Sequence, residues 1–187
     1  MGKLIYSLNV SLDGFVETPD HSLEWANVDD EVHQWFNDQA RGITASLYGR
    51  RMYELMNGYW PNGETDPDAT ATTRDFSRIW KATPKIVFSS SLDAVEGNAR
   101  LVRGGNVADE LARVREAFPG DLDIGGATLA ASFIRRGLVD EFRLLVHPVV
   151  LGSGTPFFPA LESPLRLRLT DTHRFASGVV YQGYAAA

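Results

Sequence analysis

The order of apolar and polar residues predicts a chain in which strands and helices alternate. Runs rich in β-branched and apolar residues, each ended by turn-forming residues, predict strands, and apolar residues spaced three or four apart predict amphipathic helices. The predicted strands are residues 3–10, 44–48, 85–89, 101–102, 122–124, 140–151, 165–169 and 179–184, and Pro148 is expected to break the one at 140–151. The predicted helices are residues 29–39, 50–57, 74–81, 106–118 and 128–136. The polar stretch between residues 58 and 73 predicts a long loop.

This alternation favours one α/β domain that spans residues 1–187. Strands joined by helices form mostly parallel sheets whose two faces are covered by helices. The last two predicted strands have no helix between them, so they are expected to form an antiparallel edge. We therefore expect a three-layer fold with helices on both faces of a central sheet. Sheets of this class bind ligands at the carboxyl ends of their strands, where the strand order reverses.

Composition excludes several classes of function. The chain has 187 residues, 44% hydrophobic and 22% charged, with a net charge of −6, which argues against nucleic acid as a main partner. It has no cysteine, so disulfides, thiolate metal sites and cysteine nucleophiles are excluded. Its histidines are scattered, and we expect no metal centre. We see neither a signal peptide nor an apolar run of about 20 residues, and therefore expect a cytoplasmic protein with no membrane partner.

Two strand-to-helix turns contain glycine where the backbone would approach a ligand. Gly49 precedes one predicted helix, and Gly125 and Gly126 precede another. A helix start exposes free N–H groups and the positive end of the helix dipole, so both turns are suited to phosphate. Glycine at such a position can also serve only a tight turn or close packing, and the common GxGxxG dinucleotide motif is absent.

Basic and hydroxyl residues near the first turn strengthen the phosphate interpretation. Arg50 and Arg51 follow Gly49, and Ser89 and Ser90 follow the next predicted strand. Guanidinium groups and hydroxyls together suit a phosphate monoester such as the ribose 2′-phosphate of NADPH. The alternative is that the two arginines only form a solvated helix face.

Several motifs, in order along nearly the whole chain, resemble one protein family. They are Ser-x-Asp-Gly at residues 11–14, Gly-Arg-Arg-x-Tyr-Glu at 49–54, Tyr-Trp-Pro at 59–61, Lys-Ile-Val-Phe-Ser at 85–89, Gly-Gly at 125–126, and residues 137–141 running into 147–154. With these motifs the chain resembles the dihydrofolate-reductase-like proteins. The resemblance is closest to the C-terminal reductase domain of the bifunctional deaminase/reductase proteins of riboflavin biosynthesis.

The resemblance implies an NADPH-dependent oxidoreductase that transfers a hydride to a C=N or C=O carbon of a small heterocyclic substrate. It also implies a homodimer. The cofactor contacts that it implies are Asn9, Val10, Ser11, Gly14, Gly49, Arg50, Arg51, Ser89, Ser90, Gly125, Gly126, Ala127, Thr128 and Leu129. Among these, residues 9–11 would border the nicotinamide and residues 125–129 the pyrophosphate.

Three further residues are candidates for the substrate pocket. Asp13 is the expected catalytic acid by resemblance, although it can also be an ordinary Asp-Gly turn. Trp60, on the predicted loop, is a candidate roof for a flat substrate. Glu141 is a candidate second acid in the pocket, but pairing with Arg143 or Arg168 is its alternative role.

One departure from the family pattern leaves the function open. True dihydrofolate reductases carry a carboxylate in the first helix that binds the pteridine ring, and the corresponding position here is Val32. The neighbouring acids are Asp29, Asp30 and Glu31. The alternatives to a reductase are therefore a non-catalytic nucleotide-binding protein that retains the fold and a structural module that binds no nucleotide.

Overall fold

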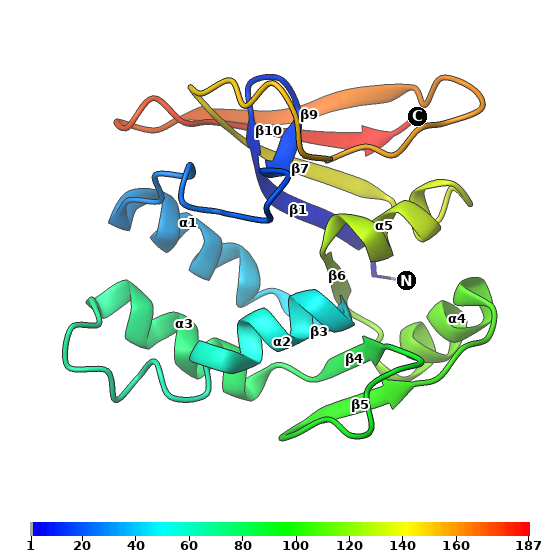
Figure 1. Cartoon of the computed structure of the whole chain (residues 1–187). Helices are drawn as coiled ribbons and strands as arrows, with labels where there is room; N and C mark the ends of the chain where they lie inside the picture. The colour runs from blue at the N-terminus through cyan, green and yellow to red at the C-terminus, as the bar shows by residue number, and fades with distance from the viewer. Residues whose placement is uncertain (1) are drawn as a thin grey trace.

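An eight-stranded sheet organises the computed structural model, which describes residues 2–187 (Figure 1). The strand order is β5-β4-β3-β6-β1-β7-β10-β9. These strands are β1 (Leu4–Ser11), β3 (Ile43–Gly49), β4 (Lys85–Phe88), β5 (Ala99–Val102), β6 (Asp121–Gly125), β7 (Glu141–His147), β9 (Leu167–Arg174) and β10 (Val180–Ala186). The short strands β2 (Phe15–Glu17) and β8 (Thr155–Pro156) form a separate pair. The helices are α1 (Asp30–Ala40), α2 (Arg50–Tyr59), α3 (Ala71–Ala82), α4 (Val107–Ala117) and α5 (Ala127–Ile134).

Six neighbouring strands, from β5 to β7, pair in parallel, and β10 is antiparallel to both β7 and β9. This arrangement confirms the expected α/β fold with an antiparallel C-terminal edge. The strand order reverses around β6, which lies between β1 and β3. The turns that follow β1, β3, β4 and β6 therefore meet at one edge of the sheet, because parallel strands end on the same side.

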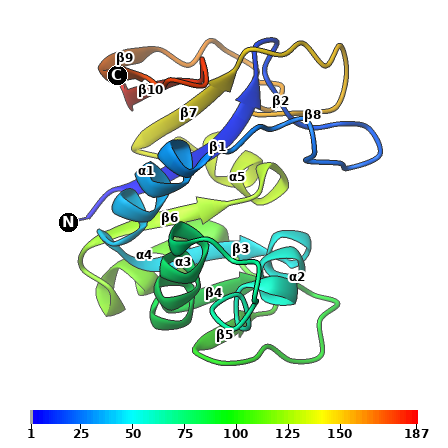
Figure 2. The same ribbon diagram turned by 90° about the vertical axis from the view of Figure 1, so that its left-hand side faces the viewer.

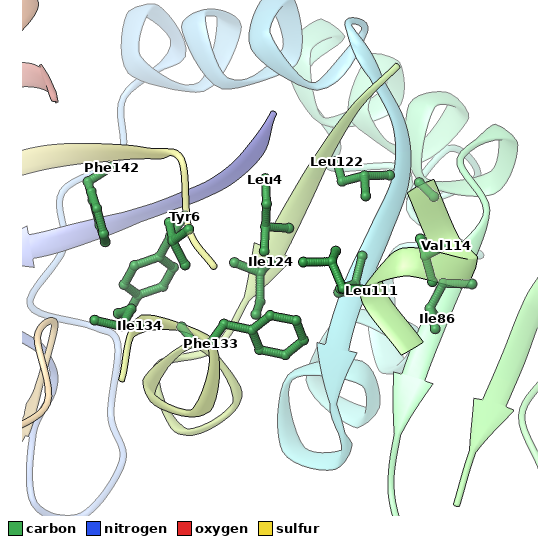
Figure 3. Close-up of a cluster of buried hydrophobic side chains, with 14 of the residues drawn as sticks. Leu4, Tyr6, Ile86, Leu111, Val114, Leu122, Ile124, Phe133, Ile134 and Phe142 are labelled. Atoms are coloured by element: carbon green, nitrogen blue, oxygen red, sulfur yellow. The ribbon is translucent and has the colours of Figure 1, made fainter. Parts of the chain in front are cut away.

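The larger hydrophobic core lies between the sheet and the helices α4 and α5. Figure 1 shows these helices on one side of the central strands and α1 and α3 on the other. Leu4 and Tyr6 in β1 and Leu122 and Ile124 in β6 point into this core, where Phe133 of α5 is fully buried (Figure 3). Alternate residues of a strand face opposite sides of a sheet, so the residues between them face α1 and α3.

The predicted strand at residues 140–151 is interrupted at Pro148 as expected, but it does not resume after the proline. Strand β7 ends at His147 because Pro148 has no backbone N–H to continue the ladder. The following segment forms a loop, and its short strand β8 pairs with β2, a pairing that the sequence pattern did not predict. This pairing brings the loop after β7 next to the turn after β1.

Two other boundaries differ from prediction for local reasons. Helix α3 begins at Ala71 rather than at residue 74, because the hydroxyl of Thr70 accepts a hydrogen bond from the Thr73 N–H and caps the helix. The predicted loop is correspondingly shorter. Strand β9 continues to Arg174, well past the predicted residue 169, because an exposed edge strand can be polar.

Candidate functional site

A cavity of about 310 Å³ lies between the sheet and the helices α1, α2 and α3. Figure 2 views the sheet from this side, with α1 and α3 in front of the strands. The floor of the cavity comes from β1, β3, β6 and β7, and its walls from the three helices. Its volume is within the range of small-molecule sites. The fold therefore leaves a ligand-sized space on the face opposite its larger core.

Aromatic side chains form much of the cavity wall. Trp60, at the C-terminal cap of α2, lines the cavity, as does Phe76 of α3. Their rings meet edge to face with centroids 4.5 Å apart, and the His33 ring lies 5.9 Å from that of Trp60. Flat apolar walls of this kind favour a flat ligand.

Asp123 of β6 is an acid on the cavity floor that the sequence patterns did not single out. In the sheet it is level with Ile5 of β1 and Ser46 of β3, and both of these residues also line the cavity. Burial raises the pKa of Asp123 to about 6, while hydrogen bonding by Ser46 and by its own backbone N–H acts in the opposite direction. The signal in the sequence was an acid between two apolar residues of a short strand, two residues before a Gly-Gly turn.

Glu141 does not line the cavity but supports a residue that does. Its carboxylate accepts hydrogen bonds from Lys3 Nζ at 2.8 Å and from Arg143 Nε at 2.6 Å. Burial raises the pKa of Glu141, but these two hydrogen bonds outweigh it and leave the pKa below its usual value. Arg143 lines the cavity, and its Nη1 donates to Gln39 Oε1 at 2.7 Å. The ion pair with Arg143, the alternative role expected for Glu141, is therefore present.

Asp13 lies in the exposed turn after β1 and is not among the cavity-lining residues. Its Oδ1 accepts hydrogen bonds from the Ser11 hydroxyl at 2.7 Å and the Leu151 N–H at 3.1 Å. Its Oδ2 accepts one from the Gly152 N–H at 2.7 Å. The hydrogen bond from Ser11 is the main reason why the pKa of Asp13 lies below its usual value. The Asp13 carboxylate thus links this turn to the loop after β7 by hydrogen bonds. The catalytic role of Asp13 stays a prediction.

The two glycine turns lie side by side at the carboxyl edge of the sheet. Helices α2 and α5 begin after Gly49 and Gly126, and within residues 2–187 neither has a side-chain cap. Side chains cap the other helices, namely α1, α3 and α4. A Cβ atom added at Gly49 would lie 3.5 Å from Cβ of Leu129, so the first turns of α2 and α5 are in contact. Two uncapped helix starts therefore face the same region.

These turns also border the cavity. Gly125 lines it, and a Cβ atom there would lie only 2.4 Å from the ring of Tyr48, another lining residue. Asn9, at the other end of the predicted cofactor site, lines it as well, and its Oδ1 lies 2.8 Å from Nε2 of the buried His147. The next residue, Val10, is buried in the larger core.

The two arginines after Gly49 point to different parts of the molecule. Arg50 Nη1 donates to the Ser91 hydroxyl at 3.5 Å, in the turn after β4. In the same turn Ser89 Oγ accepts the N–H groups of Ser91 and Leu92. Arg51 instead forms an ion pair of 2.8 Å with Glu17 of β2. Only Arg50 therefore lies at the serine turn.

Two further features of the described residues concern membrane-spanning helices and metal-binding side chains. Within residues 2–187 no helix is long and apolar enough to cross a membrane. In the same range no three His, Asp or Glu side chains gather in a way that could hold a metal ion.

Comparison with known proteins finds both sequence and structural relatives. The RibD C-terminal domain family matches residues 2–181. The uncharacterized protein YyaP of Bacillus subtilis (strain 168) is 35% identical over 95% of this chain and 92% of its own.

Two solved structures are similar to this chain in fold. A diaminohydroxyphosphoribosylaminopyrimidine deaminase/5-amino-6-(5-phosphoribosylamino)uracil reductase of Thermotoga maritima has a TM-score of 0.70 at 14% identity, and the match covers 100% of this chain and 57% of that chain. The dihydrofolate reductase of Enterococcus faecalis, complexed with NADP(H), has a TM-score of 0.65 at 16% identity and covers 99% of this chain and 96% of its own. Both structural similarities show the fold.

Proposed function

Because this chain belongs to the RibD C-terminal domain family, a family of reductases, we propose that it is an NADPH-dependent reductase of a small heterocyclic substrate. The contact between the two uncapped helix starts, beside a ligand-sized cavity, is the observation that carries this proposal. Free N–H groups at two adjoining helix starts suit the two phosphates of a dinucleotide. The dihydrofolate reductase of Enterococcus faecalis, which shares the fold, was solved with NADP(H).

The residues at this edge fit the dinucleotide. Gly126 has a φ of 92°, which favours glycine, and a Cβ atom there would lie 3.2 Å from Cβ of Met52. A larger residue would therefore be strained and would crowd Met52 of α2. Ala127, Thr128 and Leu129 form the first turn of α5 and would hold the pyrophosphate together with Gly49, while Arg50 and Ser89 would bind the 2′-phosphate. When bound, NADPH supplies a hydride from carbon 4 of its nicotinamide.

The cavity is the proposed substrate site. Asn9 and Gly125 line it and also belong to the proposed cofactor site, so the two sites adjoin. Trp60 and Phe76 would hold a flat ring and exclude water from it. A homodimer is part of the proposal on family resemblance alone, and sedimentation velocity would measure it.

A binding and turnover experiment tests the reductase proposal. NADPH is titrated against the protein while tryptophan fluorescence is recorded, and NADPH oxidation is then followed with pterins, pyrimidine-aminoribosyl compounds and small imines. We expect saturable NADPH binding and oxidation that depends on one class of acceptor. Absence of NADPH binding would contradict the proposal. Binding without oxidation would favour the non-catalytic nucleotide-binding protein instead.

Replacing Arg50 with alanine is expected to reduce the preference for NADPH over NADH. The 2′-phosphate is present only in NADPH, and losing one exposed guanidinium contact to it corresponds to about tenfold in affinity. NADH affinity should change far less. Arg78→Ala is the matched control, because Arg78 is an exposed arginine of α3 whose Nε pairs with Glu64 at 2.7 Å. Equal losses of both dinucleotides in Arg50→Ala would show that Arg50 does not bind the 2′-phosphate.

A further inference from the structure

Asp123 places a carboxyl group on the floor of the cavity, where it forms no ion pair with any of residues 2–187. Its neighbours along β6, Leu122 and Ile124, are buried on the other side of the sheet in the larger core (Figure 3). Asp123 therefore faces α1–α3, at the same level as the cavity residues Ile5 and Ser46. This position follows from strand alternation and needs no distortion of the sheet.

One carboxyl oxygen of Asp123 lacks a hydrogen-bond partner. The side chain as a whole is half-buried because it borders the cavity, yet Oδ1 is buried and has no partner within residues 2–187. A buried acceptor without a donor costs free energy, and a donor on a ligand or an ordered water would relieve that cost. The terminal torsion of a carboxyl group is soft, so either oxygen can turn toward a bound molecule.

The other titratable groups that line the cavity do not supply a counter-ion. Arg143 of β7 already bonds Glu141 and Gln39. Burial lowers the pKa of His33 of α1, although Asp30 and Asp75 oppose this, so its ring is mainly neutral at neutral pH. Burial raises the pKa of Tyr48 of β3 well above its usual value, so its hydroxyl keeps its proton. Within residues 2–187 the cavity lining therefore supplies no counter-ion to Asp123, and an N–H donor on a ligand would suit its unpaired oxygen.

We propose that Asp123 is the specificity-determining residue of the cavity and that it accepts a hydrogen bond from an N–H edge on a flat, otherwise apolar ring. This inference rests on the proposed function, because it names the substrate class of the same site. The ring would lie against Trp60 and Phe76, with its N–H edge on β6. Val32 of α1 has no carboxylate with which to bind the ring. Asp123 of β6 would supply that carboxylate instead.

The charges also indicate what the substrate lacks. A phosphate group in the cavity would need a free cation. Among the described lining residues, Arg143 is the permanent cation, and its guanidinium group is already engaged by Glu141 and Gln39. We therefore expect the substrate to carry no phosphate, unlike the phosphoribosyl compound named for the relative of Thermotoga maritima.

Calorimetric titration with two matched probes tests the role of Asp123. The probes are 2-aminoquinoline, which has an N–H edge, and 2-methylquinoline, which has the same flat shape without it. In Asp123→Asn the affinity for 2-aminoquinoline should fall by roughly tenfold to a hundredfold, the effect of losing a charge-assisted hydrogen bond. The affinity for 2-methylquinoline should stay within about twofold, since its contacts are apolar. The matched control is Asp109→Asn, which removes one exposed charge from α4 on the other side of the sheet.

Measuring NADPH affinity on the same variants tests the proposed cofactor separately from the role of Asp123. NADPH affinity measured on the same variants should be unchanged, because Asp123 lies outside the proposed phosphate contacts. If Asp123→Asn binds both probes as the native protein does, the role of Asp123 is overturned whether or not NADPH binds. If only NADPH binding fails, the proposed cofactor is overturned and Asp123 keeps its role. Asp123→Ser replaces the amide variant if circular dichroism shows that the amide variant does not fold.

Inorganic phosphate provides a separate test of the substrate charge. Added phosphate should not displace 2-aminoquinoline from the native protein. Competition at the cavity would show that a phosphate is accommodated there and would overturn the expectation of a phosphate-free substrate.

Discussion

Replacing Ala127 with proline is expected to weaken NADPH binding by about tenfold to a hundredfold without unfolding α5. Ala127 is the first residue of this helix, where proline is well tolerated because the N–H that it removes has no partner in the helix. Gly126 before it has a ψ of 125°, which is outside the α region that a following proline disfavours. The variant therefore removes one proposed phosphate donor, and a hydrogen bond to a charged oxygen is worth roughly 1.5–3 kcal/mol.

The matched control is the same substitution at the start of another helix. Ala71 is the exposed first residue of α3, and the cap of that helix uses the Thr73 N–H rather than its own. Ala71→Pro should leave NADPH affinity unchanged, and both variants should keep their midpoints of thermal unfolding within a few degrees. An Ala127→Pro variant that folds and binds NADPH normally would show that the start of α5 does not hold the pyrophosphate.

Asp123→Asn is expected to become more stable than the native protein as the pH rises, by about 3 kcal/mol at neutral pH. Burial raises the pKa of Asp123 from its usual 3.8 to about 6 in the folded protein. Between these two values the folded state holds a proton that the unfolded state has released. The native protein therefore loses stability as the pH rises through this range, and the neutral amide avoids that loss.

Urea denaturation at a series of pH values measures this effect. The free energies of unfolding of Asp123→Asn and the native protein should nearly agree at about pH 4 and differ most above about pH 6. Other groups titrate in both proteins, so their effects cancel in the difference. A difference that stays constant with pH would mean that the pKa of Asp123 is not raised by folding. A stability cost at this position would be consistent with selection for ligand binding rather than for folding.

Much of the fold was predictable because its signals are local. Alternating strands and helices predicted the parallel sheet and its antiparallel edge, and the comparison with solved relatives bears this out. Most boundaries lay within a few residues of the prediction. The exceptions were the start of α3, where the Thr70 cap is a local signal that apolar spacing alone does not detect, and the end of β9, which depends on its exposed edge position.

The candidate site was predictable only in part. Its glycine turns were recognisable because glycine directly after a strand and before a helix indicates a close backbone approach. That Arg50 and Arg51 would diverge was not recognisable, because Glu17, the partner of Arg51, lies 34 residues away in the chain. Likewise, the hydrogen bonds that hold Asp13 come from the loop after β7, 138 and 139 residues away.

The sequence by itself determined the class of fold, the family resemblance and the two phosphate-suited turns, because each of these depends on the order of neighbouring residues. Only the tertiary structure decided which acid faces the cavity. Asp123 is surrounded by residues of β1, β3 and the three helices of the cavity wall. The carboxylate of Asp13 is held by hydrogen bonds from a loop that is distant in the chain. Burial and pairing depend on what lies nearby in space, and chain order alone does not specify that.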